Sequence, residues 1–259
     1  MGTVDYRDGI AIIQLIVFPV LFVIGILIWK RIGWRAGGKS WRFVVTLALL
    51  RIIGSICTLV TINNTSERIY IAAIVCELIG VAPLLLTYIG LLGQIDTEQN
   101  INPRLLRLVT LAGFLGLILG IVGVSILDDK SSFHPNSEIK AAMGIFLAVF
   151  VIMSALAVWL GFQLWFSIKV WQKKLFFAII LSWPFLLVRL VYSAIGDYST
   201  NHNFTPGGGN DTIYLCMSVL EEIVAMALCV GFGMSAMVDK KHEEVALGET
   251  MADPKTAQV

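Results

Sequence analysis

Long apolar runs alternate with short polar segments along the chain. Seven of these runs reach about 20 residues, which is enough for a helix to cross the hydrocarbon core of a bilayer. They cover residues 9–29, 43–62, 70–93, 105–127, 139–168, 174–196 and 212–238. The pattern predicts an all-α, polytopic membrane bundle of seven transmembrane helices within residues 1–238. A polar, disordered cytosolic tail is expected over residues 239–259.

The composition excludes an ordinary soluble domain. Of the 259 residues, 57% are hydrophobic and 14% are charged, whereas soluble domains carry about 25% charged residues. The formal net charge of +1 argues against a nucleic-acid partner, which would require a basic surface. We therefore expect the lipid bilayer to be the chain's main partner.

Basic residues of the connecting segments gather on one side of the predicted membrane. That side holds residues 30–42, 104–107, 169–174 and 240–241. The other side holds residues 63–68, 128–140 and 197–211, which are mostly acidic or neutral. Because basic loops face the cytosol, the N-terminus is predicted outside and the C-terminus in the cytosol, in the endoplasmic reticulum or the plasma membrane. Four sequons for glycosylation fall on the outer side, at Asn63, Asn64, Asn203 and Asn210.

Five charged residues interrupt the apolar runs: Arg51, Glu77, Arg189, Glu221 and Glu222. A charge near the bilayer centre is costly unless it is paired, neutralised or exposed to water. At a helical rise of about 1.5 Å per residue from the outer end of each span, all five lie about 12 to 16 Å deep. This shared depth predicts one connected site in the outer half of the bundle.

Pairings within this site follow from helix faces, on which residues three and four apart are neighbours. Arg189 is expected to pair with Glu222 or Glu221, and Arg51 with Glu77. Glu222 is preferred because small residues share its face and admit a neighbouring helix. These residues are Ser218, Ala225 and Cys229. The predicted ligand-binding residues are Arg51, Glu77, Arg189, Tyr192, Glu221 and Glu222.

Three acids against two arginines leave one carboxylate without an arginine partner. One glutamate is therefore expected to be protonated, because burial beside a like charge disfavours the ionised form. A neutral carboxylic acid in a dry pocket is a Brønsted acid, so Glu77, Glu221 and Glu222 are the candidate catalytic residues. The structural alternative is that the charges pair only to hold the bundle together.

Familiar seven-helix classes need residues that this chain lacks. A retinal protein needs a lysine in its last span, and residues 213–237 contain none. The D-R-Y sequence of rhodopsin-like receptors is replaced after the third span by Gly93-Gln94-Ile95-Asp96. All three histidines lie outside the spans, and the four cysteines show no zinc spacing. We expect no metal and no cofactor.

Glycines and prolines mark three further features. Gly116 and Gly120 form a G-x-x-x-G ridge, for which packing within the bundle is the favoured interpretation and a homodimer interface the alternative. Pro83 and Pro184 are expected to kink the third and sixth helices. The glycine-rich loop over residues 197–212 is predicted to cap the outer face.

Several segments resemble a family of uncharacterised fungal seven-helix membrane proteins, a domain of unknown function. They are Arg51-Ile52-Ile53-Gly54, Asn64-Thr65-Ser66, residues 80–86 and Gly90-Leu91-Leu92. The resemblance covers most of the chain except the tail. More distantly, Ala82-Pro83 with Tyr88 and Gly90, then Arg189 with Tyr192, is similar to the fungal lipid-translocating exporter family. That family repeats an acidic residue along its last helix, whereas the two acids here are adjacent.

Three hypotheses for function follow from the buried charges and these resemblances. In the first, the protein binds or translocates a hydrophobic or amphiphilic, lipid-like small molecule, with its headgroup at the charges and its tail between helices. In the second, it is an integral membrane isoprenoid (terpene) cyclase that uses an intramembrane glutamate as the acid, because small fungal cyclases have similar size and topology. The third hypothesis is a receptor-like sensor.

The predicted orientation can be tested with tags at the two ends of the chain. In sealed microsomes, whose cytosolic surface faces the medium, we expect protease to remove a C-terminal tag and to spare an N-terminal one. Detergent should expose both tags. A C-terminal tag that stays protected until detergent is added would contradict the orientation.

Overall fold

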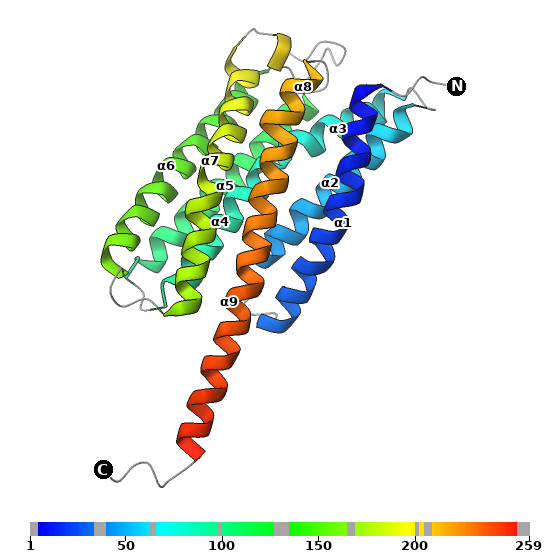
Figure 1. Cartoon of the computed structure of the whole chain (residues 1–259). Helices are drawn as coiled ribbons and strands as arrows, with labels where there is room; N and C mark the ends of the chain where they lie inside the picture. Colours follow the sequence, from blue (N-terminus) through cyan, green and yellow to red (C-terminus); the bar gives the residue numbers. More distant parts are fainter. Residues whose placement is uncertain are drawn as a thin grey trace.

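Helices make up all the regular structure in the part of the chain that the computed structural model describes (Figure 1). This part covers residues 5–33, 40–62, 66–97, 100–126, 135–164, 169–199, 202–204 and 209–252. The long helices are α1 (Tyr6–Ile32), α2 (Trp41–Thr61), α3 (Glu67–Ile79), α4 (Val81–Ile95), α5 (Pro103–Ser125), α6 (Ser137–Leu164), α7 (Val170–Tyr198) and α9 (Leu220–Ala252). The short ones are η2 (His202–Phe204), α8 (Asp211–Tyr214) and the π-helix η3 (Leu215–Val219).

Seven spans in the described residues are long and apolar enough to cross a membrane. α3 and α4 together supply the third span, Ile71–Ile95. α8, η3 and α9 supply the seventh, Asp211–Glu243. The predicted all-α bundle of seven membrane-spanning helices is confirmed, and the chain is a multi-pass membrane protein.

Polar residues fix the positions at which two of the helices begin. Asp5 accepts a hydrogen bond from the Tyr6 amide at 2.8 Å, and Asp8 accepts one from the Asp5 amide at 2.8 Å. This reciprocal capping box satisfies backbone donors that the first turn of α1 leaves free. Asn210 caps α8 without a reciprocal bond, its side chain accepting from the Thr212 amide at 3.0 Å.

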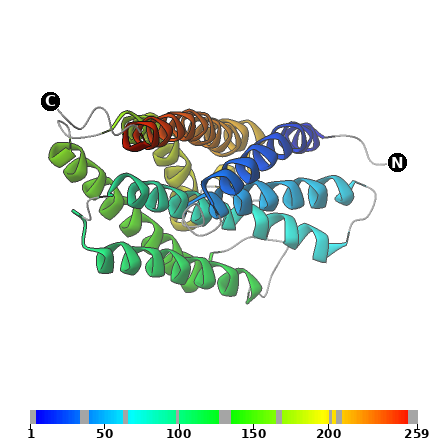
Figure 2. The ribbon, with the colours of Figure 1, turned by 90° about the horizontal axis from the view of Figure 1, so that it is seen from below.

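α4 occupies the middle of the bundle, where it contacts α2, α5, α6 and α7. Every residue from Val81 to Leu92 is buried. This stretch is apolar on all sides, which is the composition of a helix surrounded by other helices. Seen from below in Figure 2, α1 and α9 lie along one side of the bundle and α5 lies along the opposite side.

The outward faces of the peripheral helices carry large apolar side chains. Ile16 on α1, Leu108 and Leu111 on α5, and Phe162 on α6 are each more than half exposed. Soluble monomers rarely expose apolar surface on this scale. Lipid is the environment that such a surface requires.

The glycine ridge of α5 packs against α6 of the same chain. A Cβ at Gly116 would lie 2.8 Å from the Phe146 ring, and one at Gly120 would lie 3.9 Å from the Ala142 Cβ. The favoured interpretation, packing within the bundle, is confirmed. α6 therefore occupies the face that the homodimer alternative would need.

The third span breaks at Gly80, between α3 and α4, rather than kinking at Pro83. Pro83 falls in the first turn of α4, where its missing N–H leaves no helical hydrogen bond unmade. Its ring disfavours a helical turn before it, so the chain interrupts the helix one turn earlier. Pro184 lies inside α7, which continues past it as one helix.

α9 continues as a helix to Ala252, where the sequence predicted a disordered tail from residue 239. Lysine and glutamate are good helix formers, and two ion pairs tie this extension to the start of α7. They are Lys174–Asp239 and Lys169–Glu243, both at 2.6 Å. The helix projects beyond the rest of the bundle in Figure 1, and residues 253–259 lie outside the described part.

Part of the predicted outer cap is visible near the start of α8. Phe204 of η2 packs against Tyr192, with ring centroids 5.9 Å apart. The sequons at Asn63 and Asn64 lie outside the described residues. Glycosylation stays a prediction.

The glycine ridge offers a matched pair of substitutions. Gly116→Ala should destabilise the protein by about 1–3 kcal/mol, because the new methyl group collides with a buried ring. Gly120→Ala should be neutral or slightly stabilising, since its methyl group fits at ordinary contact distance and alanine favours the helix. Thermal unfolding in detergent measures both, and equal melting temperatures for the two variants would contradict the packing described here.

Candidate functional site

One carboxylate, that of Glu222 on α9, binds two arginines from two other helices. Arg51 on α2 donates from Nε and Nη2 to the two oxygens of Glu222, and Arg189 on α7 donates from Nε to Oε1 at 3.0 Å. Glu222 is 0% exposed, and the arginines are 3% and 1% exposed. This Arg51–Glu222–Arg189 network joins three helices inside the bundle.

The break between α3 and α4 makes room for the network. A Cβ at Gly80 would lie 2.7 Å from Arg51 Nη2 and 3.2 Å from Glu222 Oε1, so any larger residue would displace the pair. The end of α3 also leaves backbone carbonyls without helical partners. Arg189 Nη2 donates to one of them, the carbonyl of Glu77, at 3.1 Å.

The π-helix η3 ends at Val219, and one residue separates it from the two adjacent glutamates of α9. Such wide turns shift the direction in which the following residues point, and they occur often at functional sites. Glu222 points into the network, whereas Glu221 is half-exposed and its Oε2 has no hydrogen-bond partner in the described residues. The expected small face of Glu222 is confirmed, because its members are all buried: Ser218, Ala225 and Cys229.

The predicted pairing of Arg189 with Glu222 is confirmed, and that of Arg51 with Glu77 is wrong. Glu77 instead pairs with Arg7, whose Nη2 lies 3.2 Å from Glu77 Oε2. The sequence argument matched depths along the helices, which does not specify the direction in which each side chain points. Arg7 also reaches Asp211, with 3.8 Å between Nη1 and Oδ1.

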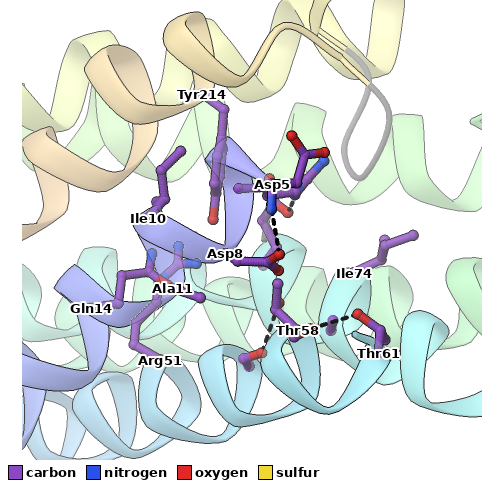
Figure 3. A pocket seen from close by; sticks show the side chains of 14 residues that line it. Asp5, Asp8, Ile10, Ala11, Gln14, Arg51, Thr58, Thr61, Ile74 and Tyr214 are labelled. Atoms are coloured by element: carbon purple, nitrogen blue, oxygen red, sulfur yellow. Dashed lines mark hydrogen bonds and ion pairs between the residues drawn. The ribbon is translucent and has the colours of Figure 1, made fainter. Parts of the chain in front are cut away.

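A polar cavity of about 200 Å³ lies beside these charges, between the start of α1, the end of α2, α3 and α8 (Figure 3). The ionisable and polar residues of its wall include Asp5, Arg7, Asp8, Gln14, Arg51, Glu77 and Tyr214. At about 30 Å³ per molecule, this volume corresponds to about six or seven waters. It suits a small polar group rather than a whole lipid.

Two residues of the cavity wall each carry a buried polar atom without a hydrogen-bond partner in the described part of the chain. The atoms are Glu77 Oε1 and Gln14 Nε2, and these residues are 8% and 5% exposed. Gln14 Oε1 is engaged, since the Ser55 hydroxyl lies 2.8 Å from it. Buried polar groups are normally satisfied, so an acceptor and a donor in one cavity indicate a place for water or for a polar ligand.

Aromatic rings adjoin the same cavity. The Arg7 guanidinium lies 5.1 Å from the centre of the Tyr214 ring, and that of Arg189 lies 5.7 Å from the Tyr192 ring. The two tyrosine rings are 6.4 Å apart. Tyr192 therefore connects the network to the end of the bundle where α8 begins.

Sequence reasoning located most of this site but missed its part on the first helix. The structure brings Arg51, Glu77, Arg189, Tyr192 and Glu222 together and leaves Glu221 outside. It adds Arg7, Asp8, Gln14 and Tyr214. Gln14 carried a signal, because it is the only strongly polar residue in the run of residues 9–29.

A second, larger cavity opens between α6 and α7, away from the charges. It measures about 730 Å³ and is lined by apolar side chains such as Phe162, Phe176, Ile179 and Trp183. No ionisable residue belongs to its lining. Among the described residues, no three of the His, Cys, Asp and Glu side chains come together in a way that could hold a metal ion.

The chain belongs to a family with the description "Domain of unknown function (DUF7702)", whose model matches residues 4–239. This match confirms the expected resemblance to an uncharacterised family over most of the chain. No curated protein and no solved structure matches the chain.

Two adjacent glutamates provide a matched test of the network. Glu222→Ala should cost about 3–5 kcal/mol of stability, because it leaves two buried arginines without their carboxylate. Glu221→Ala should have little effect, since Glu221 holds neither arginine. Both effects can be read as melting temperatures in detergent.

A double-mutant cycle then tests the contact itself. Arg189→Ala combined with Glu222→Ala should be less harmful than the sum of the single substitutions. In the Glu222→Ala variant Arg189 has already lost its carboxylate, so its removal costs less than in the wild type. Additive losses would mean that the two side chains do not interact.

Proposed function

We propose that this member of the DUF7702 family binds or translocates an amphiphilic, lipid-like molecule in the endoplasmic reticulum or plasma membrane. The headgroup occupies the polar cavity beside Glu77, and the tail lies between helices. The observation that carries the proposal is this cavity, whose wall holds unpartnered buried polar atoms inside an otherwise apolar bundle. Ionisable groups within a membrane usually mark a substrate or ion pathway.

The position of the cavity supports access from one side of the membrane. It lies at the end of the bundle where α1 and α8 begin, and the basic loops predict this end to be the outer one. A cavity of about 200 Å³ holds a headgroup but no long chain, so the tail must leave it toward the apolar part of the bundle or toward lipid.

Two helix irregularities beside the charges support a translocating role. The third span is broken at Gly80, and the seventh contains the π-helix η3. Discontinuous helices at the membrane midplane are a recurring feature of transporter binding sites. Both irregularities adjoin the Arg51–Glu222–Arg189 network.

The isoprenoid cyclase hypothesis receives less support from the cavities. An acid-initiated cyclisation needs a protonated acid and an apolar chamber in one place. Here the cavity that contains carboxylates is small and polar, and the larger apolar cavity has no ionisable group in its lining. No feature of the site favours a receptor-like sensor specifically.

Cavity filling provides the test of the proposed function. The probes are three amphiphiles with the same twelve-carbon tail: dodecyltrimethylammonium, dodecyl phosphate and 1-dodecylglycerol. At least one should raise the melting temperature of the purified protein. At a hundredfold excess of the probe over its Kd, the folded state should gain about 2.7 kcal/mol of stability. Ala11→Phe, which places a ring in the cavity, should abolish this effect without removing a charge.

The matched control fills the other cavity. Ala157 lines the apolar cavity, and Ala157→Phe should leave probe binding unchanged. Melting temperatures without probe show whether each variant is folded. If no probe stabilises the wild type, or if Ala157→Phe alone blocks binding, the polar cavity is not a site for lipid-like molecules.

A further inference from the structure

The charged side chains at the polar cavity carry more negative than positive charge. Asp5, Asp8 and Glu77 belong to the cavity wall, Asp211 adjoins it through Arg7, and Glu222 lies in the network behind it. Among the described residues, these five carboxylates face three guanidinium groups. Those belong to Arg7, Arg51 and Arg189. Two negative charges are in excess at this end of the bundle.

Arg7 already shows how this site holds a positively charged group. Its guanidinium lies between the carboxylates of Glu77 and Asp211 and 5.1 Å from the centre of the Tyr214 ring. Carboxylates together with an aromatic face are the surroundings in which proteins bind ammonium groups. Arg7 is the second residue of α1, and its side chain is 22% exposed, so a change of rotamer can carry it toward the membrane surface.

The acidic residues alone would not define a site, but Glu77 adds an independent observation. Glu77 belongs to the cavity wall and its carboxylate is buried. One oxygen binds Arg7, and the other oxygen has no partner in the described residues. An unpartnered carboxylate oxygen accepts hydrogen bonds and attracts positive charge. Gln14 Nε2, the unpartnered donor nearby, suits an oxygen atom of the ligand or a water.

Among the described residues, the two guanidinium groups of the network are not available to an anionic headgroup. Arg51 and Arg189 are both bound by Glu222, and all three side chains are almost fully buried. To bind an anion, either arginine would have to release Glu222 and leave a buried carboxylate without part of its compensation. Two arginines in a membrane would normally attract an anion, but here Glu222 already binds both of them and disfavours anion binding.

We propose that the polar cavity selects a positively charged, ammonium-type headgroup, which binds Glu77 and Tyr214 in competition with Arg7. This inference rests on the proposed function, because it names the class of amphiphile that the cavity takes. Without ligand, the Arg7 guanidinium occupies the position beside Glu77 and Tyr214. The ammonium group of the ligand replaces it there.

The test compares headgroup charge at constant tail length. Wild-type protein in uncharged dodecyl maltoside micelles is titrated with dodecyltrimethylammonium, dodecyl phosphate and 1-dodecylglycerol. The cation should bind at least about tenfold more tightly than the other two. This comparison needs no variant, so it remains decisive even if a substitution impairs folding.

Two substitutions at the ion pair should move the cation's affinity in opposite directions. Glu77→Gln should weaken dodecyltrimethylammonium binding by about tenfold, because it removes the attracting charge. Arg7→Gln should strengthen it, because it removes the competitor, whereas loss of a merely structural ion pair would not strengthen binding. Lys169→Gln, at an exposed ion pair near the opposite end of the bundle, should leave the affinity for dodecyltrimethylammonium unchanged.

Each outcome has a distinct meaning. Equal or tighter binding of the phosphate or glycerol probe would overturn the charge selectivity and leave the proposed function intact. Equal binding of tetramethylammonium, which lacks the tail, would retain the selectivity and overturn the lipid-like ligand. Weaker cation binding by Arg7→Gln would contradict competition, and failure of every probe would overturn both proposals.

Discussion

The geometry of the half of the bundle in which α1 and α8 begin depends on a single carboxylate that binds two buried guanidinium groups. Without water, a charge in the hydrocarbon region is tolerated only beside a compensating charge, so Arg51, Arg189 and Glu222 must remain together. They come from α2, α7 and α9, which fixes the relative positions of these helices. The neighbouring α3–α4 break is part of the same constraint, because only glycine fits at position 80 beside Arg51.

The irregular backbone near the network follows from the same requirement. A regular third helix would pair the carbonyl of Glu77 internally, whereas the break leaves this carbonyl for Arg189. An unpaired carbonyl is costly in lipid. The carbonyl of Glu77 therefore needs Arg189 as its donor, and Arg189 in turn finds in this carbonyl an acceptor for its Nη2 group. The π-helix η3 precedes Glu222 and sets its direction. Charges and discontinuities therefore stabilise one another and cannot be changed independently.

The sequence predicted the spans and most members of the site, because apolar length and depth along a helix can be counted directly. It predicted the partner of Arg189 but not that of Arg51, since a count of depth says nothing about direction around the helix axis. Glu77 and Arg51 have similar depths, yet Glu77 binds Arg7 from the first helix. Arg7 was overlooked because it precedes the apolar run, although its long side chain reaches inward. The helix beyond residue 239 was missed because polar composition alone was interpreted as disorder.

The charge changes sign between the cavity and the network, and this constrains the proposed movement of a ligand. The cavity wall holds the carboxylates of Asp5, Asp8 and Glu77 beside the guanidinium group of Arg7 and is net negative. The network behind it holds two arginines for one glutamate and is net positive. A cation is therefore attracted to the wall and repelled from the interior, so binding requires no change in the network. The proposed translocation would require such a change, because a cation would have to pass the net positive charge of the network.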